Sequence, residues 1–455
     1  MTERLVVIGG DAGGMAAASQ ARKRKGPDEL EIVALEKGRW TSYSACGIPY
    51  LIGGEVATVE ELVARTPQEF RDGFRIDVRL RQEAMAIDTA KQQVEVRDHE
   101  HGGRTYTLGY DQLHLGLGAT PMRPDLPGID GSSVHGVQNL EDATRLLAAT
   151  TAPGSGGGRR RKVVVVGGGY IGLEMAEAYL NRGAQVTVVT ATPQPMSTLD
   201  HDIGALVAEA MRGHGIEVRC NERVVAFEPG AVHTDAGIRL DADLVVLGMG
   251  VDPNSRLAAD AGIATGHRGA IRVDRRQRCT GTPNVWAAGD CAESFHRVTG
   301  QFVHVALGTV ANKQGRVAGI NLGGGYATFP GVVGTAVTKL CAAEVARTGV
   351  TEREATAAGF AYVVATIDST TRAGYFPGST PIKVKLLAEQ RSGRVLGAQI
   401  IGREGAAKRI DVFATAITAG LTVEDMTALD LSYAPPFSPV WDPVLIAARK
   451  VSELL

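Results

Sequence analysis

Two glycine-rich segments constrain the fold of this chain more than any other feature of its 455 residues. The first reads RLVVIGGDAGGMAAASQARKR from Arg4, and the second reads KVVVVGGGYIGLEMAEAYLNRGAQVTVVTA from Lys162. Each has β-branched residues before the glycines and helix-forming residues after them. This order predicts a strand, a tight turn and a helix, the unit that holds a dinucleotide pyrophosphate at a helix N-terminus. The repetition predicts two Rossmann-like domains and two dinucleotides, with a glycine turn that binds nothing as the alternative.

The first unit continues into the apolar run LEIVALEKG, which contains Glu36 at its end. An acidic residue about 20 positions beyond the glycines binds a ribose hydroxyl in such domains. The second unit fills the G-x-G-x-x-G pattern completely. The residues expected to contact the first dinucleotide are Gly9, Gly10, Ala12, Gly13, Gly14, Glu36 and Lys37, and those expected to contact the second are Gly167, Gly169, Tyr170, Ile171, Gly172 and Thr190.

A third motif indicates which dinucleotide the first domain holds. The segment TGTPNVWAAGDCAES, residues 280–294, runs from a short strand into Gly289 and Asp290. Flavoproteins with two dinucleotide domains use such a segment to reach the ribityl chain and the flavin phosphate. The first site is therefore expected to hold FAD. The three motifs, in this order and across nearly the whole chain, resemble those of the pyridine nucleotide disulfide oxidoreductases.

Three further stretches resemble one branch of that family, the coenzyme A disulfide reductases and NAD(P)H oxidases. They are the S-x-x-x-C-G pattern from Ser42 to Gly47, ANKQGR at 311–316 and YAPPFSPVWDP at 433–443. The resemblance implies an α/β fold with a discontinuous FAD domain (1–120 and 276–326), an NAD(P) domain (121–275) and an α+β dimerisation domain (327–455). It also implies FAD contacts from Ser44 and Asn312, NAD(P)H as the reductant, and a homodimer.

Cys46 is the cysteine, among five, whose surroundings favour chemistry. A redox cysteine works as the thiolate, and its pKa falls beside cations or at a helix N-terminus. Pro49 is typical of a first helical turn, so we expect Cys46 at the mouth of a helix with a lowered pKa. A small buried cysteine is the alternative.

The resemblance implies that the Cys46 sulfur lies over the flavin ring and works without a second cysteine. Thr41 or Ser42 stands where two-cysteine relatives carry the partner. A hydroxyl cannot form a disulfide. Cys46 is therefore expected to cycle through a mixed disulfide with substrate, or through a sulfenic acid with an oxygen or peroxide species. Whether a bound thiol caps Cys46 at rest stays open.

The resemblance further implies a catalytic role for two tyrosines. The C-terminus lacks the His–Glu pair with which two-cysteine reductases protonate the leaving thiol, and the single-cysteine branch instead carries tyrosines across the dimer interface. These correspond to Tyr375 and Tyr433. A phenol stays protonated at neutral pH and can donate a hydrogen bond or a proton to a departing thiolate. Ordinary packing residues are the alternative.

The expected substrate contacts follow the same resemblance. In SQARKRK, after the first glycine loop, Gln20, Arg22 and Lys23 correspond to positions that hold the coenzyme A nucleotide in the reductases, and cations suit phosphate. A solvated helix end with cations near its C-terminus is an equal alternative. Ser42, and Arg65 in ARTPQEF, complete the set.

Two positions depart from the family pattern. Asp11 replaces the second glycine of the first fingerprint, and its carboxylate would repel phosphate. We expect it to turn away and FAD still to bind. Thr190 stands where a Glu would favour NADH and an Arg would favour NADPH, so the sequence leaves the nicotinamide preference open.

Composition argues against other classes of partner. The net charge of −2 gives no broad basic face, which argues against nucleic acid or an anionic membrane. No apolar run reaches the roughly 20 residues of a membrane-spanning helix, and we expect a cytoplasmic protein. His99 and His101 lack a nearby third ligand and are interpreted as a hairpin tip rather than a metal site.

These patterns predict a FAD-dependent NAD(P)H:disulfide oxidoreductase with one redox-active cysteine. The expected substrate is coenzyme A disulfide or a related low-molecular-weight disulfide or persulfide, reduced in a homodimer whose active site is shared across the interface. One alternative is an NAD(P)H oxidase that reduces dioxygen or peroxide through a cysteine sulfenate. Another is a low-turnover flavoprotein redox sensor.

Overall fold

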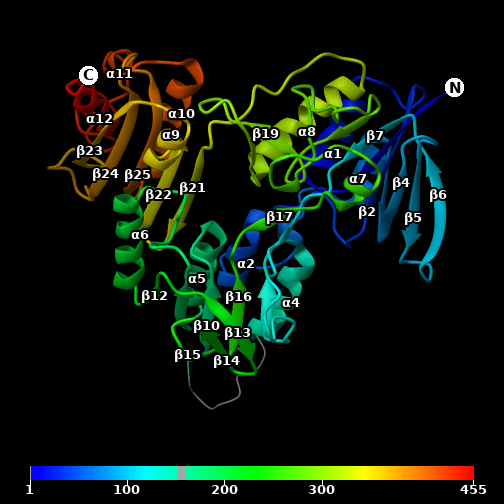
Figure 1. The fold of residues 1–455 in the computed structure, drawn as a ribbon, viewed down its shortest axis with the longest axis horizontal. Coiled ribbons are helices and arrows are strands. Elements are labelled where there is room, and N and C mark those ends of the chain that lie inside the picture. Colours follow the sequence, from blue (N-terminus) through cyan, green and yellow to red (C-terminus); the bar gives the residue numbers. More distant parts are fainter. Residues whose placement is uncertain (1, 152–159) are drawn as a thin grey trace.

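The computed structural model describes residues 2–151 and 160–455, and it divides into three lobes (Figure 1). The first lobe is built on a five-stranded parallel sheet of order β18-β7-β1-β2-β3. Its strands are β1 (Glu3–Ile8), β2 (Leu30–Glu36), β3 (Ile76–Leu80), β7 (Gln112–Leu115) and β18 (Val285–Ala287). Because β18 comes from much later in the chain than the other four strands, this sheet is discontinuous in sequence.

Alternation of side chains along these strands separates two cores. Leu5 and Val7 pack under the helices α1 (Ala12–Arg22) and α8 (Gly308–Leu322). Val6 and Ile8 face the other side, against an antiparallel meander of β4 (Gln82–Asp88), β5 (Gln93–Asp98) and β6 (Arg104–Gly109). Successive side chains point to opposite faces of a strand, so one buried strand serves both layers.

The second lobe repeats this arrangement. Its parallel sheet has the order β12-β11-β10-β16-β9. The strands are β9 (Val134–Gly136), β10 (Lys162–Val166), β11 (Gln185–Val189), β12 (Glu217–Arg219) and β16 (Leu244–Leu247). Helices α4 (Leu140–Thr151), α5 (Tyr170–Asn181) and α6 (His201–Gly213) contribute to one core, and the meander β13 (Val224–Glu228), β14 (Ala231–Thr234) and β15 (Arg239–Asp241) to another.

The third lobe is an antiparallel sheet covered by helices. Its strands are ordered β21-β22-β25-β24-β23, with bounds Ala336–Leu340, Ala343–Gly349, Val395–Gly402, Pro381–Glu389 and Tyr362–Thr370. Its helices are α9 (Glu352–Ala357), α10 (Ile410–Ala419), α11 (Val423–Thr427) and α12 (Pro443–Ser452). The architecture confirms the expected fold class of two Rossmann-like lobes and a C-terminal α+β lobe, whereas the exact domain boundaries stay a prediction.

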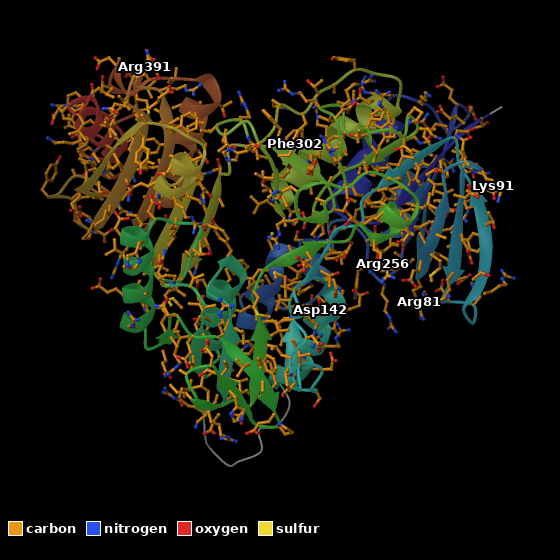
Figure 2. The ribbon with its side chains drawn as sticks, viewed as in Figure 1. Arg81, Lys91, Asp142, Arg256, Phe302 and Arg391 are labelled. Atoms are coloured by element: carbon orange, nitrogen blue, oxygen red, sulfur yellow. The ribbon has the colours of Figure 1, made fainter. Side chains whose placement is uncertain are left out.

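Shorter elements join the lobes. Strands β8 (Ala119–Pro121) and β17 (Val251–Pro253) pair between the first two, and β19 (Glu293–Phe295) pairs with β20 (Phe302–His304). The remaining helices are α2 (Ile48–Gly53), α3 (Pro67–Phe74) and α7 (Arg256–Asp260). Charged side chains such as Arg81, Lys91 and Arg391 lie on the outside of the molecule (Figure 2). No helix of the described residues is long and apolar enough to cross a membrane.

A buried ion cluster fixes the third lobe against the second. Lys385 of β24 has a side chain only 4% exposed, and its ammonium lies 2.8 Å from a carboxylate oxygen of Asp202 and 3.3 Å from one of Asp200. Glu352 supplies a third carboxylate. These contacts raise the pKa of Lys385 despite its burial, so the charge is retained. Replacing Lys385 by an uncharged residue would leave the buried carboxylate of Asp200 without this cation.

Close packing of α1 on α8 explains several glycines of the first lobe. A Cβ on Gly315 would lie 2.4 Å from the carbonyl oxygen of Gly13, and one on Gly319 would lie 2.2 Å from that of Ala17. Neither distance is compatible with a side chain. The two backbones therefore meet directly, which positions the N-terminal turn of α1 relative to α8.

We predict that Gly319→Ala lowers the free energy of unfolding by roughly 1–3 kcal/mol, because the added methyl group overpacks the contact between the helices. Gly308→Ala is the matched control in the same helix, since a Cβ there meets nothing within 4 Å. It should be neutral or slightly stabilising. Chemical denaturation followed by circular dichroism measures both, and equal midpoints for the two variants would contradict the packing argument.

Candidate active site

The first glycine loop has the geometry of an anion site at a helix N-terminus. Gly9 has φ of +107°, and a Cβ on it would lie 2.0 Å from the carbonyl oxygen of Gly116. A Cβ on Gly14 would lie 1.9 Å from the carbonyl oxygen of Gly9. Asp11 precedes α1 but its side chain does not cap the helix. The N–H groups of the first turn are therefore available to a phosphate.

Asp11 turns toward the protein backbone. Its Oδ1 accepts a hydrogen bond of 3.1 Å from the backbone N–H of Tyr43. Burial, with Glu36 and Asp290 nearby, raises the pKa of Asp11 to about 6. Whether this orientation keeps the carboxylate away from a bound phosphate stays a prediction.

Glu36 ends β2 beside the same loop. One carboxylate oxygen accepts from the N–H of Gly10 at 2.8 Å, and the other accepts from the N–H of Gly38 at 2.6 Å. Each oxygen keeps a lone pair for a ribose hydroxyl. Burial raises the pKa of Glu36, and the exposed Lys37 beside it acts in the opposite direction.

The third motif reaches this loop from β18. The N–H of Gly289 donates to Oε1 of Gln314, a fully buried side chain of α8, at 2.8 Å. Burial raises the pKa of Asp290 to about 6. Asn312, on α8, is exposed, and its amide donates to the carbonyl of Gly308. Sequence reasoning missed Gln314, although it lies within the ANKQGR stretch.

The backbone around Ser42 ties the Cys46 segment to the same glycine loop. The N–H of Ser42 donates to the carbonyl of Gly10 at 2.9 Å, and the N–H of Ser44 donates to the carbonyl of Leu62 at 2.8 Å. Thr41 also donates its hydroxyl proton to Gly10. Ser42 holds a left-handed conformation with φ of +48°, which is uncommon for a non-glycine residue. Such conformations concentrate at functional sites.

Cys46 is exposed and lies in a single 3₁₀ turn, Ala45–Gly47, directly before α2. Pro49 occupies the first turn of α2, as expected. A Cβ on Gly47 would lie 2.2 Å from a methyl carbon of Leu62, so a larger residue after the cysteine would require the Leu62 side chain to move. The thiol is thus held on a fixed backbone and remains open to solvent.

The expected lowering of the pKa of Cys46 is wrong for the protein alone. Burial raises the pKa of the thiol, and the carboxylates of Glu174 and Asp290 raise it further. Glu174 belongs to α5 of the second lobe and accepts a hydrogen bond of 3.2 Å from Thr338 of the third. Its carboxylate disfavours the Cys46 thiolate.

The second glycine loop repeats the geometry of the first. Gly167 has φ of +110°, and a Cβ on Gly172 would lie 2.0 Å from its carbonyl oxygen. Gly169 precedes α5, whose first residues Tyr170 and Ile171 pack against the core of the second lobe. No side chain caps this helix.

Beside that loop, the residue expected to discriminate between the nicotinamide cofactors is uncharged, and the cation at the end of the neighbouring strand is paired. Thr190 is buried, and its hydroxyl lies 2.8 Å from that of Thr192. Arg219 ends the neighbouring strand β12, but its guanidinium donates to Glu222 at 2.7 Å and to Glu217 at 2.9 Å. The two glutamates neutralise this cation.

Tyr375 and Tyr433 are brought together on the third lobe. A hydrogen bond between their side chains raises the pKa of Tyr433. They are 78% and 46% exposed, in a patch with exposed Phe437, Val440 and Trp441. The phenols therefore form a surface pair in the single chain.

Of the expected substrate contacts, Arg22 and Arg65 lie close together, whereas Gln20 and Lys23 have separate surroundings. Arg22 donates to the carbonyls of Phe74 at 2.9 Å and Arg75 at 3.1 Å, and Arg65 stacks its guanidinium 4.7 Å from the ring centre of Phe74. The two arginines thus meet at Phe74. Gln20 packs against α8, and Lys23 is exposed at the end of α1. The carbonyl contacts give Arg22 a structural function in addition to any role in binding.

The other cysteines and histidines do not form a second centre in the part of the chain that is described. Cys291 is fully buried, and burial raises its pKa to about 12, which suits a packing residue. His99 and His101 pair with Glu83 and Asp98 at the tip of the β4–β6 meander. No group of three or more possible ligands there has the arrangement of a metal site.

Comparison with known proteins gives close matches over the full length. The chain is 36% identical over 452 residues to a CoA-dependent NAD(P)H sulfur oxidoreductase of Pyrococcus furiosus, covering 98% of both chains. It is 34% identical over 457 residues to an NADH oxidase of Methanocaldococcus jannaschii, covering 99% of each. The solved structure of reduced Bacillus anthracis CoADR-RHD superposes with a TM-score of 0.95 at 34% identity, covering all of this chain and 81% of that one.

Two family models divide the chain where the lobes do. Residues 3–315 match the pyridine nucleotide-disulphide oxidoreductase model, and residues 335–443 match the dimerisation domain of the same family. The first range spans both dinucleotide lobes, and the second covers most of the antiparallel sheet and its helices. The chain belongs to the pyridine nucleotide-disulphide oxidoreductase family.

Proposed function

We propose that this protein is a FAD-dependent NAD(P)H:disulfide oxidoreductase in which Cys46 is the single redox-active cysteine and coenzyme A disulfide, or a related small disulfide or persulfide, is the substrate. The observation that carries the proposal is the attachment of the Cys46 segment to the first glycine loop through Gly10. This attachment supports an exposed Cys46 thiol close to the proposed dinucleotide site.

The residues of the first lobe fit FAD. The uncapped N-terminal turn of α1 supplies donors for the pyrophosphate, Glu36 supplies an acceptor for a ribose hydroxyl, and Gly289 with Asp290 borders the same space. FAD supplies two-electron transfer between NAD(P)H and sulfur. NAD(P)H is assigned to the second lobe because its glycine loop also ends at an uncapped helix.

The chemistry of Cys46 balances as thiol–disulfide exchange. The Cys46 thiolate attacks one sulfur of the substrate, a Cys46–substrate disulfide forms, and the other half departs as a thiolate that takes a proton. Two electrons that originate from NAD(P)H then cleave the mixed disulfide, release the second thiol and return Cys46 to its starting state. The sum is NAD(P)H, one proton and one disulfide converted to NAD(P)⁺ and two thiols.

The raised pKa of Cys46 bears on the first step. Since Glu174 and Asp290 disfavour the thiolate, the thiol must lose its proton as the cycle begins. Once it has formed, the thiolate of a thiol with a higher pKa is intrinsically the stronger nucleophile. Turnover is therefore expected to rise with pH through the pKa of Cys46.

Tyr375 and Tyr433 are proposed to act from the second subunit of a homodimer. They lie on the third lobe, on the loop after β23 and in the stretch before α12, whereas Cys46 precedes α2 at the meeting of the first two lobes (Figure 1). The family's dimerisation domain and the exposed aromatic patch support an interface there. The phenol pair would protonate the departing thiolate.

NAD(P)H oxidase activity is the second candidate, and the named NADH oxidase relative favours it. In that reaction two electrons from NAD(P)H would first reduce dioxygen to peroxide. The Cys46 thiolate would then take one peroxide oxygen to form a sulfenic acid while the other leaves as water, and two further electrons would reduce the sulfenic acid to the thiol and a second water. A low-turnover redox sensor is the remaining alternative, and fast steady-state turnover with a small disulfide would count against it.

We predict that Cys46→Ser lowers anaerobic NAD(P)H oxidation by coenzyme A disulfide at least 100-fold, because serine cannot form the mixed disulfide. The variant should keep its bound FAD, seen in the flavin absorbance. Cys341→Ser is a control, since it makes the same change at a thiol that the proposed reaction does not use. Absence of anaerobic disulfide turnover in the wild type, with oxygen uptake that requires Cys46, would support the oxidase instead.

Tyr433→Phe is predicted to slow disulfide turnover by roughly tenfold or more, because it removes an acid from the leaving thiolate. Flavin reduction by NAD(P)H, measured by stopped-flow absorbance, should not change. Tyr326→Phe serves as control, since Tyr326 is a similarly exposed tyrosine at 77%.

Mixed dimers of the Cys46→Ser and Tyr433→Phe chains test the shared site. If the site uses Cys46 from one subunit and Tyr433 from the other, a mixed dimer contains one intact site and regains about half of the activity per dimer. If the mixed dimers are as inactive as the two homodimeric variants, Cys46 and Tyr433 of the same chain form each site.

Asp11→Asn is predicted to tighten FAD binding several-fold at pH 8 and to have no effect at pH 5. The pKa of Asp11 is raised to about 6, so the carboxylate is charged and repels phosphate above that pH and is neutral below it. Asparagine keeps the acceptor for the N–H of Tyr43. Titration of FAD-depleted protein followed by flavin fluorescence measures both constants, and weaker binding at pH 8 would overturn this account of Asp11.

A further inference from the structure

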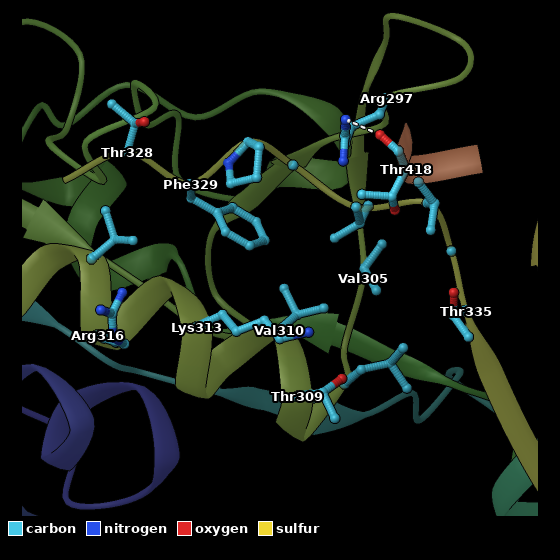
Figure 3. A pocket seen from close by; sticks show the side chains of 17 residues that line it. Arg297, Val305, Thr309, Val310, Lys313, Arg316, Thr328, Phe329, Thr335 and Thr418 are labelled. Carbon is cyan, nitrogen blue, oxygen red and sulfur yellow. Dashed lines mark hydrogen bonds between the residues drawn. The ribbon is translucent and has the colours of Figure 1, made fainter. Parts of the chain in front are cut away.

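A groove on the outer side of α8 has no part in the site described above. It runs between α8, the segment from Thr328 to Thr335, and Thr418 at the end of α10 (Figure 3). None of the residues assigned to FAD, NAD(P)H, the thiol chemistry or the substrate lines it. The opposite side of α8 packs on α1 through Gly315 and Gly319, so the groove faces away from the first glycine loop.

Three cations line this groove without acidic partners. Arg297 donates one hydrogen bond, of 2.9 Å, to the carbonyl of Thr418. Lys313 and Arg316, one turn apart on α8, make no hydrogen bond or ion pair with any described residue, and both are exposed. No Asp or Glu is among the lining residues. By contrast, the largely buried cations Lys385 and Arg409 are each paired with a carboxylate.

The floor of the groove is apolar. Val310, Val317, Phe329 and Val332 form a small buried cluster there, each less than 9% exposed. Threonine hydroxyls from Thr309, Thr328 and Thr335 stand at its rim. Figure 3 shows Lys313 and Arg316 on α8 and the ring of Phe329 on the facing segment. Unpaired cations over an apolar floor with an aromatic ring match a ligand that is anionic at one end and flat or apolar at the other.

We propose that this groove binds the phosphates of a nucleotide, with Lys313, Arg316 and Arg297 as the phosphate contacts and the apolar floor under the base. Guanidinium and ammonium groups form strong charge-assisted hydrogen bonds with phosphate oxygens. The source is either a free adenine nucleotide or the nucleotide end of coenzyme A. Only the coenzyme A source rests on the proposed function.

Isothermal titration of the FAD-loaded homodimer with ADP, and separately with coenzyme A, tests the proposal. Millimolar NAD⁺ is present throughout, so that the second glycine loop is already filled. The variants are Lys313→Ala, Arg316→Ala and their combination. Arg256→Ala, whose side chain is 94% exposed on α7 (Figure 2), is the matched loss of one cation elsewhere.

The wild type is expected to bind at least one of the two ligands, more weakly as salt is raised. The double variant should bind roughly tenfold or more weakly, since each lost phosphate contact is charge-assisted, and Arg256→Ala should match the wild type. Binding of ADP and coenzyme A alike assigns the groove to free nucleotides, and binding of coenzyme A alone assigns it to that substrate.

Three results would overturn the inference. The first is that neither ligand binds to the wild type, and the second is that the wild type and the double variant bind equally well. The third is that the double variant changes its oligomeric state while its binding is unchanged, which would mean that the cations contact the second subunit. Lys313→Glu, which reverses one charge, replaces the double variant if the latter does not fold. Anaerobic turnover with cystine dimethyl ester, which carries no phosphate, should be unaffected in all variants, so that failure here is distinct from failure of the proposed function.

Discussion

The carbonyl of Gly10 is the point on which the candidate site depends. It lies in the first glycine loop and accepts hydrogen bonds from the N–H of Ser42 and the hydroxyl of Thr41. Because Gly10 also donates its own N–H to Glu36, one residue connects the first glycine loop, the carboxylate proposed to bind a ribose hydroxyl and the segment that carries Cys46. Glycine has no side chain to block any of these contacts. The position of the thiol therefore follows from the fold of the loop.

The electrostatic environment of the glycine loop and of Cys46 disfavours the thiolate, which is the form in which a cysteine reacts. Asp11, Glu36, Asp290 and Glu174 all surround the loop or the thiol, and the pKa values of all four carboxyl groups are raised, chiefly by burial. Burial and the carboxylates of Glu174, Asp290 and Asp11 raise the pKa of Cys46 and so disfavour its thiolate in the chain alone.

Local patterns predicted the parts of the structure that depend on adjacent residues. Glycines after β-branched runs gave both Rossmann-like units, and Pro49 marked the start of α2, because strand, turn and helix propensities act over a few residues. The pKa of Cys46 was predicted wrongly, since Glu174 lies far along the sequence and reaches the thiol only in the folded chain. The sequence could not predict three further features for the same reason, because each depends on which helices and strands pack together in the folded chain. These are the carbonyl contacts of Arg22, the burial of Gln314 and the unpaired cations Lys313 and Arg316.

The central claim is that one sulfur relays electrons from NAD(P)H to the substrate. Protein treated with coenzyme A disulfide, freed of excess reagent and titrated with NADH without oxygen tests it most directly, because the stoichiometry counts the redox centres. The account predicts two NADH consumed per subunit, one for the flavin and one for the Cys46 mixed disulfide, with one coenzyme A thiol released. Consumption of one NADH per subunit, with no thiol released and no added mass on Cys46, would contradict it.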